Sequence, residues 1–332
     1  MKAEDFLPEE AVIAGIRVEL DRYEAERRGA RRAVMWRVPV FDGLVLAAVA
    51  VPAHLFNGLI DPYEQWVSTP HWMLYLLGLV ALFYVHARAM RPARLLQQAL
   101  RDRVVPAIFG FIEGVTYSHE VTPPSFARLP RETVGSFDRQ TFDDIVTGRY
   151  EGFPFELYEA ALRLGSGKSS VDVFKGIIVA FEPVAPFPGL VVAGRRAGKV
   201  TGFFRGLFGE RLREIQSGNA SLDAVYEFRT DNVEAALPLV TGRLAQALEW
   251  LRETWPENPS RVALTGSDGF LLIPQAKDYF ELPGISQPLD YKRHVEPMVA
   301  DMAALLATAA LVRKAGAPDD APADRDDGAQ KE

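Results

Sequence analysis

Two apolar segments lie close together in the first third of the chain. The first, Val38 to Phe56, reads VPVFDGLVLAAVAVPAHLF, and the second, Trp72 to Val85, reads WMLYLLGLVALFYV. Both are short for a hydrocarbon core, which a helix of about 20 residues crosses. A pair of buried helices in a soluble protein is therefore the competing interpretation.

The arginines around these segments favour a membrane. Lys and Arg do not occur between Val38 and Ala87, whereas arginines flank the pair on both sides, a bias typical of cytoplasmic ends. They are Arg27, Arg28, Arg31, Arg32 and Arg37 before the first segment and Arg88, Arg91, Arg94, Arg101 and Arg103 after the second. The pattern predicts a transmembrane hairpin over residues 37–88, with helices at about 38–56 and 70–87 and the loop outside.

Two crossings would leave both chain termini in the cytosol. The first residues are mostly charged and lack the pattern of a cleavable signal peptide, so residues 1–36 are expected to be retained as a cytosolic segment with a helix from about Glu9 to Arg32. Trp66 and Trp72 flank the outer loop, where an interfacial aromatic belt would lie. The absence of cysteine agrees with a cytosolic location.

Asp42 and His86 occupy matching depths in such a hairpin, one near the start of the first helix and one near the end of the second. They are candidates for an intramembrane pair. The alternative is that each side chain separately reaches the water of the headgroup region.

Residues 89–315 are predicted to form a juxtamembrane helix and a cytosolic α+β domain with a largely antiparallel sheet and packing helices. Short β-rich runs carry hairpin signals at 165–170 and 267–269, and a helix is predicted from Val233 to Trp255, with Asp231 and Asn232 as candidate caps. The last helix, from about Asp290 to Lys314, is interpreted as a packing helix because it contains Asp301. The Pro- and Asp-rich residues 316–332 are expected to be a disordered acidic tail.

The string GSGKSS, around Lys168, resembles part of a phosphate-binding loop. Leu162 stands where such a loop has its first glycine, and a β-rich run follows where the loop requires a helix. We interpret the stretch as a hairpin loop. No other catalytic motif occurs, so neither a cofactor nor a metal is expected, and the carboxylates Glu151, Glu156, Glu159, Asp172 and Glu182 are interpreted as a solvated face.

The segment 194–216 alternates basic and aromatic residues. Such a composition is typical of peripheral segments that bind anionic lipid. The alternative is an insertion whose aromatic side chains pack on the domain while its arginines are solvated. The candidate lipid contacts are Arg195, Arg196, Lys199, Phe203, Phe204, Arg205, Phe208, Arg211 and Arg213. A net charge of −7 disfavours nucleic acid as a partner.

The runs GRYEGFPFELYEA, VFKGIIVAFE, VYEFRTDNVEAALPLVTGRLAQALEWL and VALTGSDGFLLIP resemble a bacterial membrane-protein family that carries domain of unknown function 3137. The resemblance spans about Tyr117 to Leu306 and implies two N-terminal membrane helices before a cytosolic domain. The family has no established activity and implies no catalytic residues.

These patterns together predict a two-span protein of the bacterial inner membrane. Its cytosolic domain would bind a protein partner or the membrane surface without catalysis. A membrane-anchored enzyme of an unidentified reaction class is the alternative.

Overall fold

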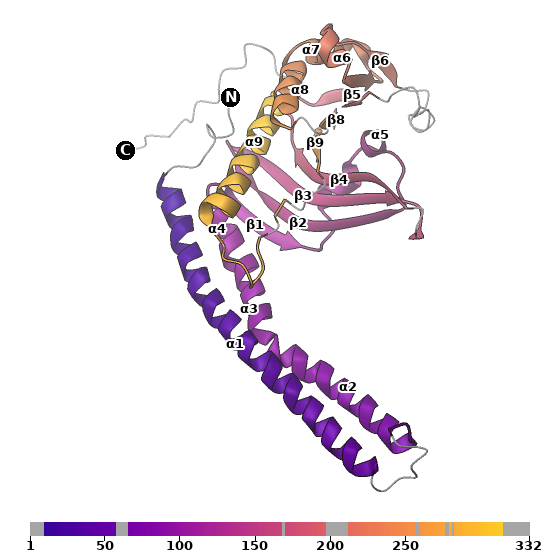
Figure 1. Ribbon diagram of the computed structural model, residues 1–332. Coiled ribbons are helices and arrows are strands. Elements are labelled where there is room, and N and C mark those ends of the chain that lie inside the picture. Colours follow the sequence, from indigo (N-terminus) through magenta and orange to yellow (C-terminus); the bar gives the residue numbers. More distant parts are fainter. Residues whose placement is uncertain are drawn as a thin grey trace. The chain divides into compact units, whose positions relative to one another are not determined.

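The computed structural model describes residues 10–57, 66–167, 170–196, 212–255, 259–275, 279–280 and 282–314. The chain forms two compact units. Among the described residues, one unit comprises 10–108 with Leu282–Val295, and the other comprises those from 109 to 280 and from 296 to 314. We call them the helical unit and the sheet unit (Figure 1).

The helical unit consists mainly of two long helices, α1 (Glu10–Asn57) and α2 (Thr69–Ala89). The second half of α1 lies beside α2 (Figure 1). Gly78 allows this close approach, because a Cβ added there would lie 2.3 Å from Cγ2 of Val49. The sequence predicted a separate N-terminal helix that ends near Arg32, whereas the structure has one continuous helix. The linking residues 33–37 contain no glycine or proline to break it, and Pro39 is accommodated inside the helix.

The chain leaves α2 through α3 (Arg91–Ala99), the π-helical turn η2 (Leu100–Val104) and α4 (Val105–Ile108). The predicted juxtamembrane helix is therefore irregular and ends at Ile108. Pro106 cannot donate the backbone hydrogen bond that a regular helix would need at this point, which agrees with the widened turn just before it.

The segment Leu282–Val295, which ends in the π-helical turn η5 (Tyr291–Val295), packs on the N-terminal half of α1 within the same unit. The buried Arg27 donates to the carbonyl of Ile285 at 2.9 Å, and Oε1 of Glu24 accepts from the amide of Leu289 at 2.7 Å. Partial burial acts to raise the pKa of Glu24, but the hydrogen bonds from Arg27 and the amide of Leu289, with the charges of Arg27 and Arg28, lower it overall. Side-chain hydrogen bonds therefore hold the segment Leu282–Val295 against this half of α1.

The sheet unit contains a nine-stranded sheet in the order β1-β2-β3-β4-β9-β8-β5-β7-β6, in which every neighbouring pair is antiparallel. The strands are β1 (Glu113–His119), β2 (Arg139–Tyr150), β3 (Phe153–Leu164), β4 (Val171–Phe181), β5 (Phe187–Arg195), β6 (Arg213–Ile215), β7 (Tyr226–Thr230), β8 (Arg261–Gly266) and β9 (Asp268–Pro274). The predicted α+β class with an antiparallel sheet is confirmed.

Short turns set the register of the hairpins. Glu151 and Gly152 both have positive φ and form the turn that joins β2 to β3. The run GRYEGFPFELYEA therefore contains the end of one strand, a turn and the start of the next. The predicted hairpins around 165–170 and 267–269 join β3 to β4 and β8 to β9.

Both faces of the central strands are covered, as the unbroken burial of Ile177 to Phe181 indicates. On one face, Phe174 and Ile178 belong to a core cluster with Leu129 and Val134. The short helices η3 (Pro124–Arg128) and α5 (Arg131–Val134) flank Leu129. The opposite face of β4 packs against α9 (Glu296–Arg313) (Figure 1).

The remaining helices are α6 (Ala220–Asp223), α7 (Val233–Thr241) and α8 (Arg243–Thr254). The side chain of Asn232 caps α7 by accepting from the amide of Ala235 at 3.2 Å, so one of the two predicted caps is confirmed. The predicted single helix from Val233 to Trp255 breaks at Gly242.

Candidate functional site

The most distinctive surface of the helical unit is apolar. Three helical stretches in the described chain are long and apolar enough to cross a membrane, by length and composition. In α1 and α2 only 6% and 11% of the most apolar window is buried, whereas 72% is buried in Tyr291–Arg313. The last helix is therefore confirmed as a packing helix, and the apolar side chains of α1 and α2 face outward.

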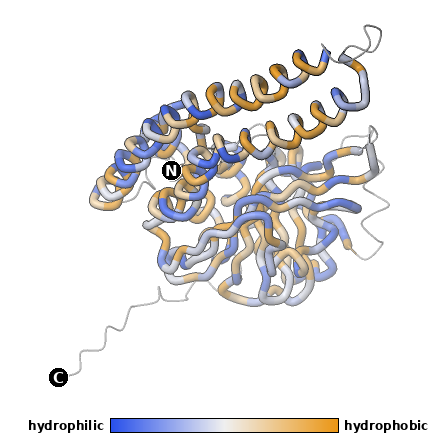
Figure 2. Tube along the Cα trace, turned by 90° about the horizontal axis from the view of Figure 1, so that it is seen from below, coloured by the Kyte–Doolittle hydropathy of each residue, from blue (hydrophilic) through white to orange (hydrophobic). Residues whose placement is uncertain are grey.

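These outward side chains form a surface that we call the apolar belt. Its most exposed member, Phe83, is 76% exposed. Figure 2 shows the same hydrophobic character along the second half of α1 and along α2, in contrast to the hydrophilic first half of α1. The belt consists of Val40, Leu44, Leu46, Val51 and Leu55 on α1, Trp72, Met73, Leu76, Leu77, Leu79, Val80, Phe83 and Tyr84 on α2, and Trp66 and Val67 just before α2.

Polar contacts join α1 to α2 at both ends of the belt. At one end Nδ1 of His86 lies 2.9 Å from Oδ2 of Asp42, so the structure brings this predicted pair together. At the other end the fully buried His71 bridges the helices: Nε2 donates to the carbonyl of Ala53 at 3.0 Å, and Nδ1 lies 2.7 Å from the hydroxyl oxygen of Ser68. Polar side chains that bind each other in this way cost less free energy in an apolar environment than unpaired ones.

Arginine side chains lie next to the belt, beyond the Asp42–His86 contact. On α1, Arg37 lies five residues before Asp42. Arg91, the first residue of α3, lies five residues after His86. We call the exposed set here the arginine band, which consists of Arg31, Arg32, Arg37, Arg88, Arg91 and Arg94.

The basic and aromatic segment 194–216 lies largely outside the described residues, including Lys199, Phe203, Phe204, Arg205, Phe208 and Arg211. Its described members are held by the sheet. Arg196 donates to the carbonyl of Asp223 at 2.7 Å and to Glu214 at 3.0 Å, while Arg195 and Arg213 lie on β5 and β6.

The GSGKSS stretch lies between β3 and β4, and the residues that follow it form a strand. Lys168 itself lies outside the described residues. The strand context agrees with the hairpin interpretation, since a phosphate-binding loop opens a helix.

The interpretation of the carboxylates as a solvated face is wrong for two of them. Glu156 accepts from the amide of Ser125 at 2.8 Å, and Glu159 accepts from the amides of Tyr279 and Phe280 at 2.5 and 3.2 Å. These backbone donors come from segments distant in sequence, which explains why strand alternation alone did not reveal them. Glu151 and Asp172 are exposed, and the backbone carbonyl of Glu182 accepts from Nε of Arg313 at 3.0 Å.

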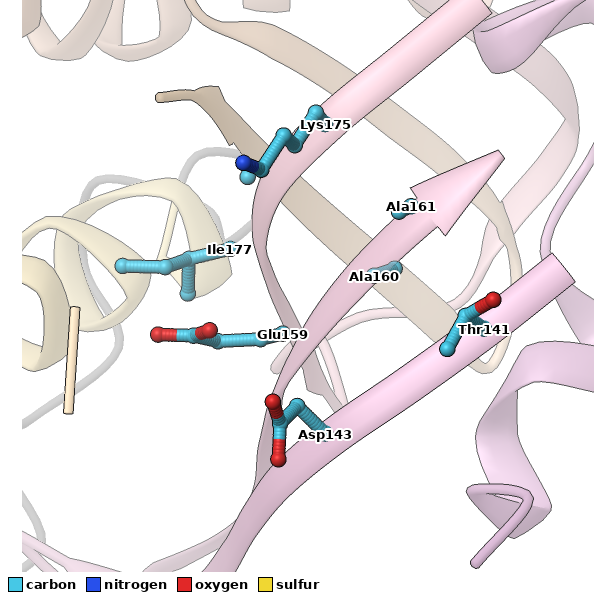
Figure 3. A pocket seen from close by; sticks show the side chains of 8 residues that line it. Thr141, Asp143, Glu159, Ala160, Ala161, Lys175 and Ile177 are labelled. Carbon is cyan, nitrogen blue, oxygen red and sulfur yellow. The ribbon is translucent and has the colours of Figure 1, made fainter. Parts of the chain in front are cut away.

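Glu159 lines a cavity of about 170 Å³ on the face of the sheet that α9 covers. Figure 3 shows the side chains of Asp143, Glu159 and Lys175 around it, from three neighbouring strands. Beside Glu159, burial and the charges of Asp301 and Glu159 raise the pKa of Tyr279 well above its ordinary value, and burial raises the pKa of Asp301 to about 6.

Asp143 also belongs to a second group of polar residues, which the sequence analysis missed. Nδ1 of His119, at the end of β1, lies 2.7 Å from Oδ1 of Asp143 and 3.1 Å from Oδ1 of Asp144. The register of β2 shifts between Phe142 and Ile145, and this irregularity brings two consecutive carboxylates to one imidazole. The only sequence signal was the adjacent pair of aspartates inside an otherwise β-rich run.

Neither protein-family models nor curated proteins yield a match to this chain. Among solved structures, the chain is similar to the crystal structure of the mycobacterial trehalose monomycolate transport factor A, TtfA, with 13% identity and a TM-score of 0.33. The match covers 64% of this chain and 96% of that one.

Proposed function

We propose that α1 and α2 form a transmembrane hairpin that anchors the protein in a bacterial inner membrane, and that the α+β domain acts in the cytosol by binding a partner or the membrane surface without catalysis. The apolar belt carries this proposal. So many large apolar side chains on one surface would cost about 25 cal/mol for each Å² left in water, whereas lipid removes that cost. The sequence resemblance supports membership of the family with domain of unknown function 3137.

The orientation rests on the arginine band. Arginines concentrate on the cytoplasmic side of membrane helices, and here the band borders one end of the belt only. Both chain termini would then lie in the cytosol, with the loop between α1 and α2 outside.

Topology reporters test this arrangement. A reporter that is active only outside the cytosol should be active when fused after Gln65 and silent when fused after Lys314. A cytosolic reporter at the same two positions should give the reverse pattern. Activity of the outside reporter after Lys314 would rule out a hairpin with cytosolic termini.

The cavity beside Glu159 is small for a small-molecule site. Its volume of about 170 Å³ is below the range of roughly 300–1,000 Å³ that is common for small-molecule sites. A membrane-anchored enzyme remains the second candidate because Asp143, Glu159 and Lys175 converge on that cavity. Cross-linking and purification of the full chain from solubilised membranes tests the binding proposal, which predicts a stoichiometric protein partner or enriched anionic lipid.

A further inference from the structure

The group at the end of β1 has the composition of a metal site. His119, Asp143 and Asp144 each offer one ligand atom, and these atoms all lie within 4.8 Å of one another. One is an imidazole nitrogen and two are carboxylate oxygens. The side chain of Asp144 is 11% exposed and that of His119 is 21% exposed, so the group is partly shielded from water.

The distances suit a shared cation. Adjacent ligands at about 2.1 Å from a metal lie about 3.0 Å apart in octahedral geometry and about 3.4 Å apart in tetrahedral geometry. The separations from Nδ1 of His119 are 2.7 Å to Asp143 and 3.1 Å to Asp144, which are nearer to the octahedral value. A single imidazole N–H cannot point at both carboxylates with good geometry, whereas one cation can be bound by all three groups.

The surroundings add negative charge and support. Oε1 of Glu120 lies 3.5 Å from Nε2 of His119, so three carboxylates surround one imidazole. The hydroxyl of Tyr117 donates to Asp144, as an outer partner that orients a ligand does. Independently, Asp143 lines the cavity shared with Glu159, which offers space beside the group for water or a small ligand.

We propose that His119, Asp143 and Asp144 bind one divalent transition-metal ion, with its remaining coordination positions open toward water. The imidazole favours Zn²⁺ or Mn²⁺ over Mg²⁺ and Ca²⁺, which prefer ligand sets made only of oxygen. Three protein ligands with open positions resemble a catalytic more than a structural zinc site, so this inference goes beyond the non-catalytic role proposed above.

Metal titration of the full chain in detergent tests the proposal. After treatment with a chelator, the wild type should bind one Zn²⁺ per chain by calorimetry, and Zn²⁺ should raise its thermal midpoint. His119→Ala and Asp144→Asn should each weaken Zn²⁺ binding by about 100-fold or more and abolish the thermal shift. Mg²⁺ at the same concentration should produce a much smaller shift.

Two further variants keep the result interpretable. Asp143→Asn alters the most exposed of the three ligands, at 44%, and so tests the site even where Asp144→Asn fails to fold. His294→Ala is the matched control, because His294 also lies beside an aspartate, Asp290, but outside this group. Absence of saturable Zn²⁺ binding, or equal loss of binding in His294→Ala and His119→Ala, would overturn the proposal.

Discussion

Gly176 is the residue at which the sheet has least room. Its φ is +150°, and an added Cβ would lie 2.1 Å from the carbonyl of Ile273 and 2.7 Å from the amide of Gln275. Gly176→Ala should therefore push β4 away from β9 and lower the free energy of unfolding by about 3 kcal/mol or more. Thermal unfolding of the purified chain measures this loss.

Gly194→Ala, on β5, is the matched control for Gly176→Ala. An added Cβ meets nothing within 4 Å at Gly194, so this variant should unfold within about 0.5 kcal/mol of the wild type. Equal behaviour of the two variants would show that β4 and β9 are not as close as described.

Asp301 makes stability depend on pH. Burial raises its pKa from the ordinary 3.8 to about 6, so the folded chain keeps this proton at pH values where the unfolded chain has released it. Between about pH 4 and pH 6 the folded state binds more protons, and this contribution to stability falls as pH rises. Asp301→Asn is neutral throughout and should be more stable than the wild type at pH 7.5, by on the order of 1 kcal/mol after solvent screening.

The difference between Asp301→Asn and the wild type should disappear below about pH 4, where both side chains are neutral. Thermal midpoints from pH 4 to pH 7.5 measure it. Asp172→Asn, at a side chain 53% exposed and paired with Arg163, is the control and should leave the slope between pH 4 and pH 6 unchanged. A wild type whose midpoint rises as steeply as that of Asp301→Asn over this range would contradict the assignment to Asp301.

At the scale of elements, the packing of α1 on α2 depends on a small residue. Gly78→Leu should separate the helices, because even a Cβ at Gly78 meets Val49. The chain has no native cysteine, so Asp42→Cys with His86→Cys gives a clean disulfide reporter of this packing. Cross-linking should be efficient in the Gly78 background and at least several-fold slower with Gly78→Leu.

Leu79→Ala is the control for Gly78→Leu, since Leu79 is 55% exposed and belongs to the apolar belt rather than to the contact between the helices. It should leave the rate of disulfide formation unchanged. Slowing by Leu79→Ala to the same extent would mean that the helices meet through another face.

Elements that depend on short-range sequence signals, such as turns and helix caps, could be predicted from the sequence. The β3–β4 and β8–β9 hairpins follow from glycine-rich turns, and the start of α7 follows from the cap at Asn232. β1 could not be predicted, because its strand character depends on pairing with β2. The group at His119 was missed for the same reason, since Asp144 is 25 residues away and reaches it only through an irregularity in the sheet. Asp42 and His86 lie 2.9 Å apart, and their matching depth could be read from the sequence, although the sequence left open whether the two side chains meet.

For the whole molecule, the arginine band should select lipid. Each arginine near an anionic leaflet contributes about 1 kcal/mol. Replacing Arg31, Arg32, Arg37, Arg88, Arg91 and Arg94 by glutamine should reduce the anionic phospholipid that copurifies with the full chain by at least several-fold. The protein should still insert through the apolar belt. Quantitative lipid analysis of the purified protein measures the change.

The control for the arginine band removes charge elsewhere. Arg139→Gln, Arg149→Gln and Arg163→Gln change exposed or partly exposed arginines of β2 and β3 and should leave lipid retention unaltered. If both sets reduce anionic lipid in proportion to the charge removed, retention reflects total charge and not the band.

The continuity of α1 also has a mechanical meaning. Its 48 residues form a rod of about 72 Å at 1.5 Å per residue. One half carries the apolar belt, and the other holds Leu282–Val295 through Arg27 and Glu24. If such a rod pivots at one end by 10°, the other end swings by about 12 Å. A change in bilayer thickness or helix tilt would therefore move the segment Leu282–Val295, which is bound to the other end of α1. Pro39 is the position at which α1 would bend first.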